Sequence, residues 1–318
     1  MSPLAILITY CVLIACAAFT GGLLPSLLKL THTRMQVIMS FVGGLVLGIG
    51  LLHLLPHSVA STGSMDATAQ SALIGLLVMF FLIRIFHVHQ HGPVDDDHKH
   101  DPECVGAHHH HDYPTTGEKC DSHNRKYGWI GLALGLSLHT LIDGMALAAS
   151  VMDDAEHHAE GDWALFGLGT FCAIFLHKPL DGMSIATVMA AGNWPIRNQR
   201  IVSGVFALMC SVGALAFYFG LRQMGDQSQM VLGCALGVAA GVFLCISLAD
   251  ILPEIQFHTH DRVKLSAALL LGLALAYGIG FLESGHQHGG PHQDNHQHQG
   301  HSHQGHSHQD HSHQDHDH

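Results

Sequence analysis

The sequence predicts an all-α, polytopic membrane protein with eight transmembrane helices. Of its 318 residues, 48% are hydrophobic and only 12% are charged, about half the charged fraction of an ordinary soluble domain. Eight apolar stretches are each long enough to cross a hydrocarbon core of about 30 Å at a rise of 1.5 Å per residue. The formal net charge of -12 excludes binding to nucleic acid through a basic surface, because there is no cationic excess to hold phosphates. Six of the eight cysteines lie in apolar runs, where they act as small hydrophobes rather than as a disulfide framework.

The expected spans follow from the apolar runs. They cover residues 4–28, 36–58, 71–88, 128–151, 163–191, 199–221, 229–252 and 264–284. The first span has no basic residue before Lys29 and no cleavage region, so we expect a retained helix rather than a signal peptide. With the N-terminus outside, eleven of the 13 lysines and arginines fall in inner segments. The positive-inside rule therefore predicts both termini on the non-cytosolic side, in a plasma or inner membrane rather than an organelle.

Two polar segments divide the chain into four parts. The expected parts are 1–86 with three spans, 87–127 as a cytosolic loop, 128–285 with five spans and the metal site, and 286–318 as a tail. Histidine is over-represented, with 32 copies, and both polar segments are rich in it. Neither can bury apolar surface, so both are expected to be disordered. Neutral imidazoles bind transition metals loosely, and the loop's candidate auxiliary ligands are His98, His100, His108, His109, His110 and His111.

The most informative residues are ionisable groups within the spans, because lipid excludes them unless they are paired or line a cavity. The fourth span contains His139 and Asp143, the fifth contains His177 and Asp181, and both follow the pattern His-x-x-x-Asp-Gly. A separation of four places each imidazole and carboxylate on one helix face. Two nitrogens and two carboxylates suit a tetrahedral Zn2+ ion, and one divalent cation balances two buried aspartates. A single buried histidine is as well explained by a core hydrogen bond, but two matching pairs favour a metal site.

On these motifs residues 1–285 resemble the ZIP (Zrt/Irt-like) family of metal-ion transporters. Its fourth span typically carries His-Asn-x-x-Asp-Gly or the glutamate variant, matched here by His139, Asp143 and Gly144. Its fifth span typically carries His-Glu-x-x-His-Glu or a relative, matched here by His177 and Asp181. The resemblance implies eight spans, a homodimer and a metal moved toward the cytosol by alternating access.

Two positions depart from the family pattern. ZIP proteins often hold two adjacent metals, and the second uses the fourth-span Asn and the fifth-span Glu. Here those positions are Thr140 and Lys178. A protonated lysine has only donors and cannot ligate a metal. Our hypothesis is that the Lys178 ammonium replaces the second ion, pairs with Asp143 and Asp181, and leaves a single site.

The second and seventh spans also resemble those of the ZIP family. They read His53-Leu-Leu-Pro56-His57 and Asp250-Ile-Leu-Pro-Glu254. His53 and His57 stand four apart on one helix face, and either extend the transport path or end the helix as polar residues. Asp250 and Glu254, at the inner end of their span, form either an exit relay or a solvated terminus.

An acidic segment follows the fourth span. It contains Asp153, Asp154 and Glu156 and is expected in a loop on the outer face. There it either gathers cations at an entrance or is an ordinary solvated loop.

Together these features predict a transporter of divalent metal ions, with no enzymatic activity, whose partners are its metal and the lipid bilayer. Zn2+ is the first candidate, and Fe2+, Mn2+ and Cd2+ remain alternatives because nitrogen and oxygen ligands suit all of them. Protons should compete with the metal below about pH 6.5, where imidazole titrates. Two other functions stay open: a cation-diffusion-type exporter, which has six spans, and an intramembrane zinc hydrolase, in which the same ligands activate water.

Overall fold

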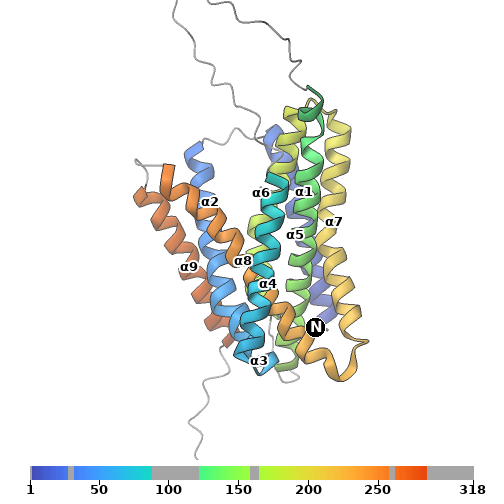
Figure 1. The fold of residues 1–318 in the computed structure, drawn as a ribbon, viewed down its shortest axis with the longest axis vertical. Coiled ribbons are helices and arrows are strands. Elements are labelled where there is room, and N and C mark those ends of the chain that lie inside the picture. The colour runs from blue at the N-terminus through green and yellow to red at the C-terminus, as the bar shows by residue number, and fades with distance from the viewer. Residues whose placement is uncertain (1, 28–31, 88–121, 158–164, 258–261, 285–318) are drawn as a thin grey trace, which may run out of the picture. The chain divides into compact units, whose positions relative to one another are not determined.

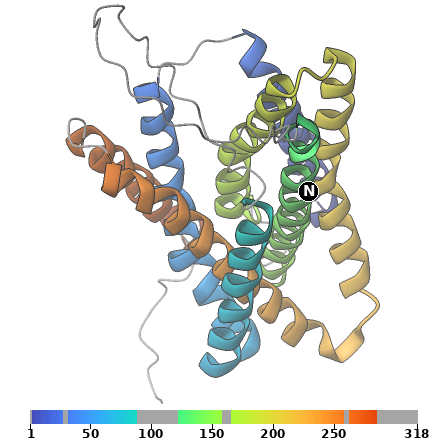
Figure 2. The same cartoon turned by 45° about the horizontal axis from the view of Figure 1, so that its top comes forward.

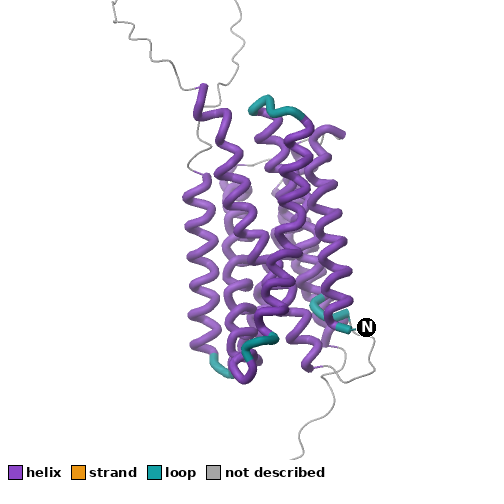
Figure 3. The backbone as a smooth tube through the Cα atoms, turned by 90° about the vertical axis from the view of Figure 1, so that its right-hand side faces the viewer, coloured by secondary structure: helices purple, strands orange, loops and turns teal. Residues whose placement is uncertain are grey.

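A computed structural model describes residues 2–27, 32–87, 122–157, 165–257 and 262–284. The chain divides into two units, Met1–Gly285 and His286–His318, and all described residues belong to the first. They are almost entirely helical (Figure 3). The helices are α1 (Pro3–Leu27), α2 (His32–Ile49), the π-helical turn η1 (Gly50–Leu54), α3 (Leu55–Thr62), α4 (Met65–His87), α5 (Ser122–His157), α6 (Leu168–Ala191), α7 (Ile196–Leu221), the 3-10 turn η2 (Gly225–Gln227), α8 (Ser228–Phe257) and α9 (Arg262–Ser284).

These elements confirm the predicted all-α bundle. α2, η1 and α3 follow one another without a break, so the described residues form eight long helical runs. Seven of the runs are long and apolar enough to cross a membrane by length and composition alone. The exception is α6, whose apolar sequence is interrupted by His177, Lys178 and Asp181. Large apolar side chains on the outside of the bundle, such as Leu73, are exposed, as expected where lipid replaces water as the solvent.

Several helix ends differ from the sequence prediction, and two of them lie at candidate residues. The second run was expected to stop at residue 58, but it continues to Thr62 and ends at Gly63 in the left-handed conformation, with φ 63°. Pro56 does not end the helix: it lies in the first turn of α3, directly after the π-helical turn, where the hydrogen-bond register changes. The fourth run was expected to stop at residue 151, but α5 extends to His157. The acidic segment therefore continues a helix instead of forming a loop.

The helices associate mainly in four pairs, which are α2 with α9, α4 with α8, α5 with α7 and α1 with α6 (Figures 1 and 2). Each pair meets through glycines on at least one partner. In the pair of α5 and α7, a Cβ on Gly144 would collide with the carbonyl oxygen of Cys210, and one on Gly213 would collide with that of Leu141. Small residues let helix backbones approach closely in lipid. The glycine of each His-x-x-x-Asp-Gly motif has this role, since Gly182 of α6 likewise touches the backbone of Ala18 in α1.

Candidate metal site

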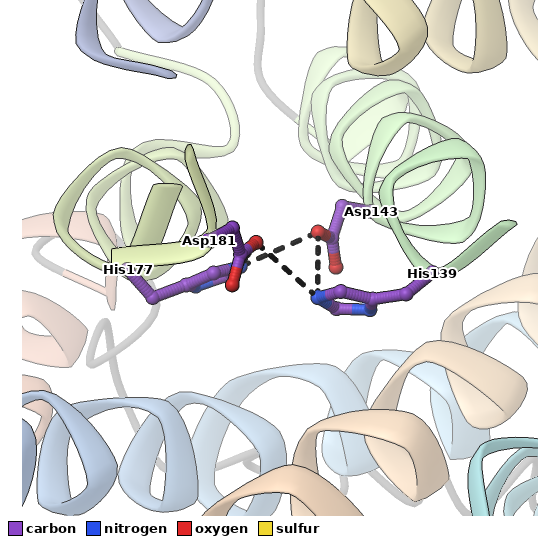
Figure 4. Close-up of side chains that lie close together, drawn as sticks. All are labelled: His139, Asp143, His177 and Asp181. Carbon is purple, nitrogen blue, oxygen red and sulfur yellow. Dashed lines mark hydrogen bonds and ion pairs between the residues drawn. The ribbon is translucent and has the colours of Figure 1, made fainter. Parts of the chain in front are cut away.

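Two helices bring the four predicted metal ligands together. α5 supplies His139 and Asp143, α6 supplies His177 and Asp181, and Figure 4 shows the four side chains converging between the helices. One ligand atom from each residue lies within 4.8 Å of those of the others. The two pairs are far apart in the sequence, and they form one cluster because the two helices run side by side and each contributes one turn.

Asp143 lies at the centre of this cluster. Its Oδ2 atom is 3.2 Å from Nε2 of His139 and 3.3 Å from Nε2 of His177. Oδ2 of Asp181 lies farther from the same two nitrogens, at 3.8 and 3.9 Å. The imidazoles stack with their ring centroids 5.7 Å apart and 28° between their planes. Both Nε2 atoms and both Oδ2 atoms therefore point toward one position.

Burial and hydrogen bonds orient the ligand atoms. The side chain of Asp143 is fully buried, whereas that of Asp181 is 16% exposed. Nδ1 of His177 donates a hydrogen bond of 2.8 Å to the carbonyl oxygen of Ala173. That bond places the ring proton on Nδ1 and leaves the lone pair of Nε2 facing the cluster, as in many metal-ligating histidines.

One carboxylate oxygen of the cluster lacks a hydrogen-bond donor among the described residues. Oδ1 of Asp143 is buried and accepts no hydrogen bond from any residue that the structure describes. A buried carboxylate oxygen without a donor costs free energy. The donor set of two imidazole nitrogens and two carboxylates, with this oxygen still free to bind, fits a divalent cation.

Lys178 lies in the same cluster and is fully buried. Its ammonium contacts Oδ2 of Asp143 and lies 3.0 Å from Oδ2 of Asp181. The ammonium therefore occupies the two oxygens that a metal ion would use. Thr140 is also buried, and its hydroxyl donates to the carbonyl oxygen of Leu136 one turn earlier, at 2.7 Å.

Comparisons with known proteins indicate the same family as the motifs. The family model described as the ZIP zinc transporter matches residues 4–280. This chain belongs to the ZIP family. It is 24% identical to zinc transporter 3 of Arabidopsis thaliana, over 75% of this chain and 71% of that protein. It is also 24% identical to zinc transporter ZIP9-A of Xenopus laevis, over 89% of this chain and 97% of that protein.

Membership in the ZIP family, together with the apolar helices, makes this chain a multi-pass integral membrane protein. It also removes one alternative drawn from the sequence. A cation-diffusion-type exporter has six spans, whereas the described residues of this ZIP protein form eight helical runs.

The structure gives two other candidate residues of this ZIP protein, His53 and His57, partners outside the four-residue cluster. Nε2 of His53 is 2.9 Å from the carbonyl oxygen of Ala276 in α9. His57 instead faces α5, with Nδ1 2.6 Å from Oδ2 of Asp153. Although they are four residues apart, the two histidines contact different helices, because His53 lies in a π-helical turn, where the hydrogen-bond register is i to i+5.

The remaining predictions fall outside what the structure describes. Asp250 and Glu254 lie in α8, but their side chains are not among the described ones. The histidines expected as auxiliary ligands, His98, His100 and His108 to His111, lie within residues 88–121, which are also outside it.

The sequence analysis named Asp153 and Asp154 of this ZIP protein as a possible cation-gathering segment, but expected them in a loop. Asp153 and Asp154 are buried in α5 rather than solvated in a loop. A signal for this was present in the sequence. Asp143, Ser150 and Asp154 are spaced by seven and four residues, which places them on one face of a continuous helix.

Proposed function

We propose that this protein transports divalent metal ions, with Zn2+ as its principal substrate, and that His139, Asp143, His177 and Asp181 bind the ion within the membrane. The observation that carries the proposal is the convergence of two imidazole nitrogens and two carboxylates, within 4.8 Å of one another, between two helices of a membrane bundle. The zinc transporters to which the chain is similar support the same substrate class.

The geometry accounts for how a strongly hydrated ion can enter lipid. A divalent ion loses its water at a large cost in free energy, and four ligands with two negative charges offset that loss. The side chain of Asp143 is fully buried and that of His139 is 3% exposed. The cluster is thus closed to solvent on the α5 side, and the partly exposed Asp181 is the ligand through which we expect the ion to exchange with water.

Lys178 makes the site a single-ion site in this proposal. Without metal, its ammonium balances one of the two aspartates. An arriving metal ion competes for the same Oδ2 atoms, so the ammonium must withdraw from at least one of them. A second ion beside Lys178 would add like charge to a buried cluster, which is costly.

Direction, mechanism and assembly are inferred from the family resemblance and from the distribution of basic residues. We propose net movement toward the cytosol by alternating access, in a homodimer with both termini on the non-cytosolic side. Fe2+, Mn2+ and Cd2+ are the competing substrates to test, because the ligand set suits each of them.

Metal uptake into proteoliposomes tests the site. His177→Ala and Asp181→Ala should abolish Zn2+ uptake, since each removes a ligand that the buried ion cannot replace with water. Ser184→Ala is the matched control, because Ser184 lies on the same helix, is exposed, and bonds to the carbonyl of Leu180 in its own helix. Uptake at the wild-type rate by either ligand variant would show that the ion binds elsewhere. Parallel assays with Fe2+, Mn2+ and Cd2+ rank the substrates.

A further inference from the structure

A second group of metal-ligating side chains lies between α3 and α5. Nδ1 of His57 is 2.6 Å from Oδ2 of Asp153 and 3.7 Å from Oδ1 of Asp154. One ligand atom from each of the three residues lies within 4.8 Å of the other two. We propose that His57, Asp153 and Asp154 form a second binding site for a divalent cation, at the end of the bundle where α3 and α5 terminate.

Hydrogen bonds from outside the group orient both carboxylates. The Ser61 hydroxyl donates to Oδ1 of Asp153, and the backbone N–H of Gly167 donates to Oδ2 of Asp154 at 2.6 Å. Each carboxylate therefore has one oxygen held by a donor and turns the other oxygen toward His57. Such supporting hydrogen bonds are typical of residues that bind metals.

Exposure and charge favour a partly hydrated divalent ion. The side chain of Asp153 is fully buried and that of Asp154 is 11% exposed, whereas His57 is 39% exposed. Water can therefore complete the coordination of an ion on the side of His57. The two carboxylates balance a divalent charge. In binding, the ion takes the place of the proton on Nδ1 of His57: in a neutral imidazole that proton moves to Nε2, and in an imidazolium it leaves to solvent.

A small pocket extends from this site into the bundle. Its lining includes His57, Asp154, Ser150 and Thr170, and the last two are joined by a hydrogen bond of 2.7 Å between α5 and α6. Ser150 lies two turns from Asp143 along α5, and Thr170 lies two turns from His177 along α6. The pocket is thus lined by both helices that hold the four-residue cluster, together with His53 and Leu54 of η1.

The two sites are nevertheless separate. Asp154 lies eleven residues from Asp143 on the same helix, about 16 Å along its axis. Between them, Leu147 of α5 and Ile174 of α6 lie on the same helix faces as the ligands, and both side chains are fully buried. The site around His57 is therefore a capture site, which holds a cation at this end of the bundle. Its position on the uptake path rests on the proposed function, whereas its ability to bind metal does not.

A cysteine substitution at His57 tests binding directly. In the full-length protein, His57→Cys keeps both carboxylates and supplies a thiolate, a good zinc ligand. Its maleimide labelling, read at position 57 by mass spectrometry, should slow about tenfold when Zn2+ is ten times its Kd. Adding Asp153→Asn and Asp154→Asn should remove the protection, and adding His177→Ala should leave it intact. Ala60→Cys, an exposed position on the same helix, should label at a rate independent of Zn2+.

Three outcomes would overturn the inference. They are labelling of the His57→Cys variant that ignores Zn2+, protection that survives both asparagine substitutions, and protection that disappears with His177→Ala. The last result would mean that only the four-residue cluster binds metal.

Uptake kinetics provide a second measurement, independent of folding defects caused by cysteine. Asp154→Asn keeps an oxygen that accepts from Gly167, so it should raise the KM for Zn2+ severalfold while the maximal rate stays near that of the wild type. An unchanged KM would refute a role in capture, even if the site binds metal. Failure of the proposed function itself would appear separately, as His177→Ala with normal uptake.

Discussion

Replacing Lys178 with methionine tests whether its ammonium acts as an internal counter-cation. Lys178 is fully buried and contacts both aspartates of the cluster. Methionine has similar volume without charge, so Lys178→Met leaves two carboxylates buried without that cation. Removing one partner of a buried ion pair costs about 3–5 kcal/mol, and we expect the metal-free protein to lose stability of this order. The measurement is thermal unfolding of the purified protein in chelator.

The same substitution should strengthen zinc binding. If the metal displaces the ammonium in the wild type, the free energy lost by metal-free Lys178→Met is regained when Zn2+ binds. A gain of about 3 kcal/mol corresponds to about a 100-fold lower Kd, measurable by calorimetric titration. Zn2+ should therefore restore most of the lost stability, and transport should slow because the ion is released less readily.

Lys178→Arg is the matched control, since it keeps the charge and should bind Zn2+ no more tightly than the wild type. The reasoning fails if metal-free Lys178→Met is as stable as the wild type, or if its affinity for Zn2+ falls. The second result would mean that Lys178 organises the ligands instead of competing for them.

Three further predictions concern packing, stoichiometry and topology. Gly144→Ala should lower the stability of the protein by about 1–3 kcal/mol, because the new Cβ meets the backbone of Cys210. Gly220→Ala is the control, since no atom lies within 4 Å of its new Cβ, and it should leave the stability unchanged. Equal unfolding temperatures for the two variants would contradict the close approach. With His57→Ala, Asp153→Asn and Asp154→Asn all in place, a metal-bound structure should show one ion in the four-residue cluster, and two adjacent ions with Lys178 turned away would disprove the single-ion site. In intact cells, a membrane-impermeant maleimide should label Met65→Cys, at the start of α4, and spare Ile196→Cys, at the start of α7; both positions are well exposed, and the reverse pattern would invert the proposed orientation.

The spans and the paired ligands could be predicted because their signals are local. A run of about 20 apolar residues identifies a span without knowledge of its neighbours. A separation of four residues places His139 above Asp143, and His177 above Asp181, in any regular α-helix. The sequence could not show that α5 and α6 are neighbours; the resemblance to the ZIP family suggested it, and the structure places them side by side.

The second site shows where local signals fail. The pairing of His57 with Asp153 spans 96 residues and depends on how α3 packs against α5. The acidic run looked like a loop because charged residues usually end an apolar span. Burial against Ser61 and the backbone of Gly167 instead keeps both carboxylates inside the helical bundle.

The sequence by itself determined the membrane class, the helical bundle and the ionisable groups within the apolar helices, since each depends on composition or on spacing within one helix. The tertiary structure alone decided which of those groups meet. It joined four candidate ligands and Lys178 into one cluster, directed His53 to α9 and turned His57 toward α5. The physical reason is that a helix fixes the direction of a side chain around its own axis, whereas the partner it meets depends on close packing between helices distant in sequence.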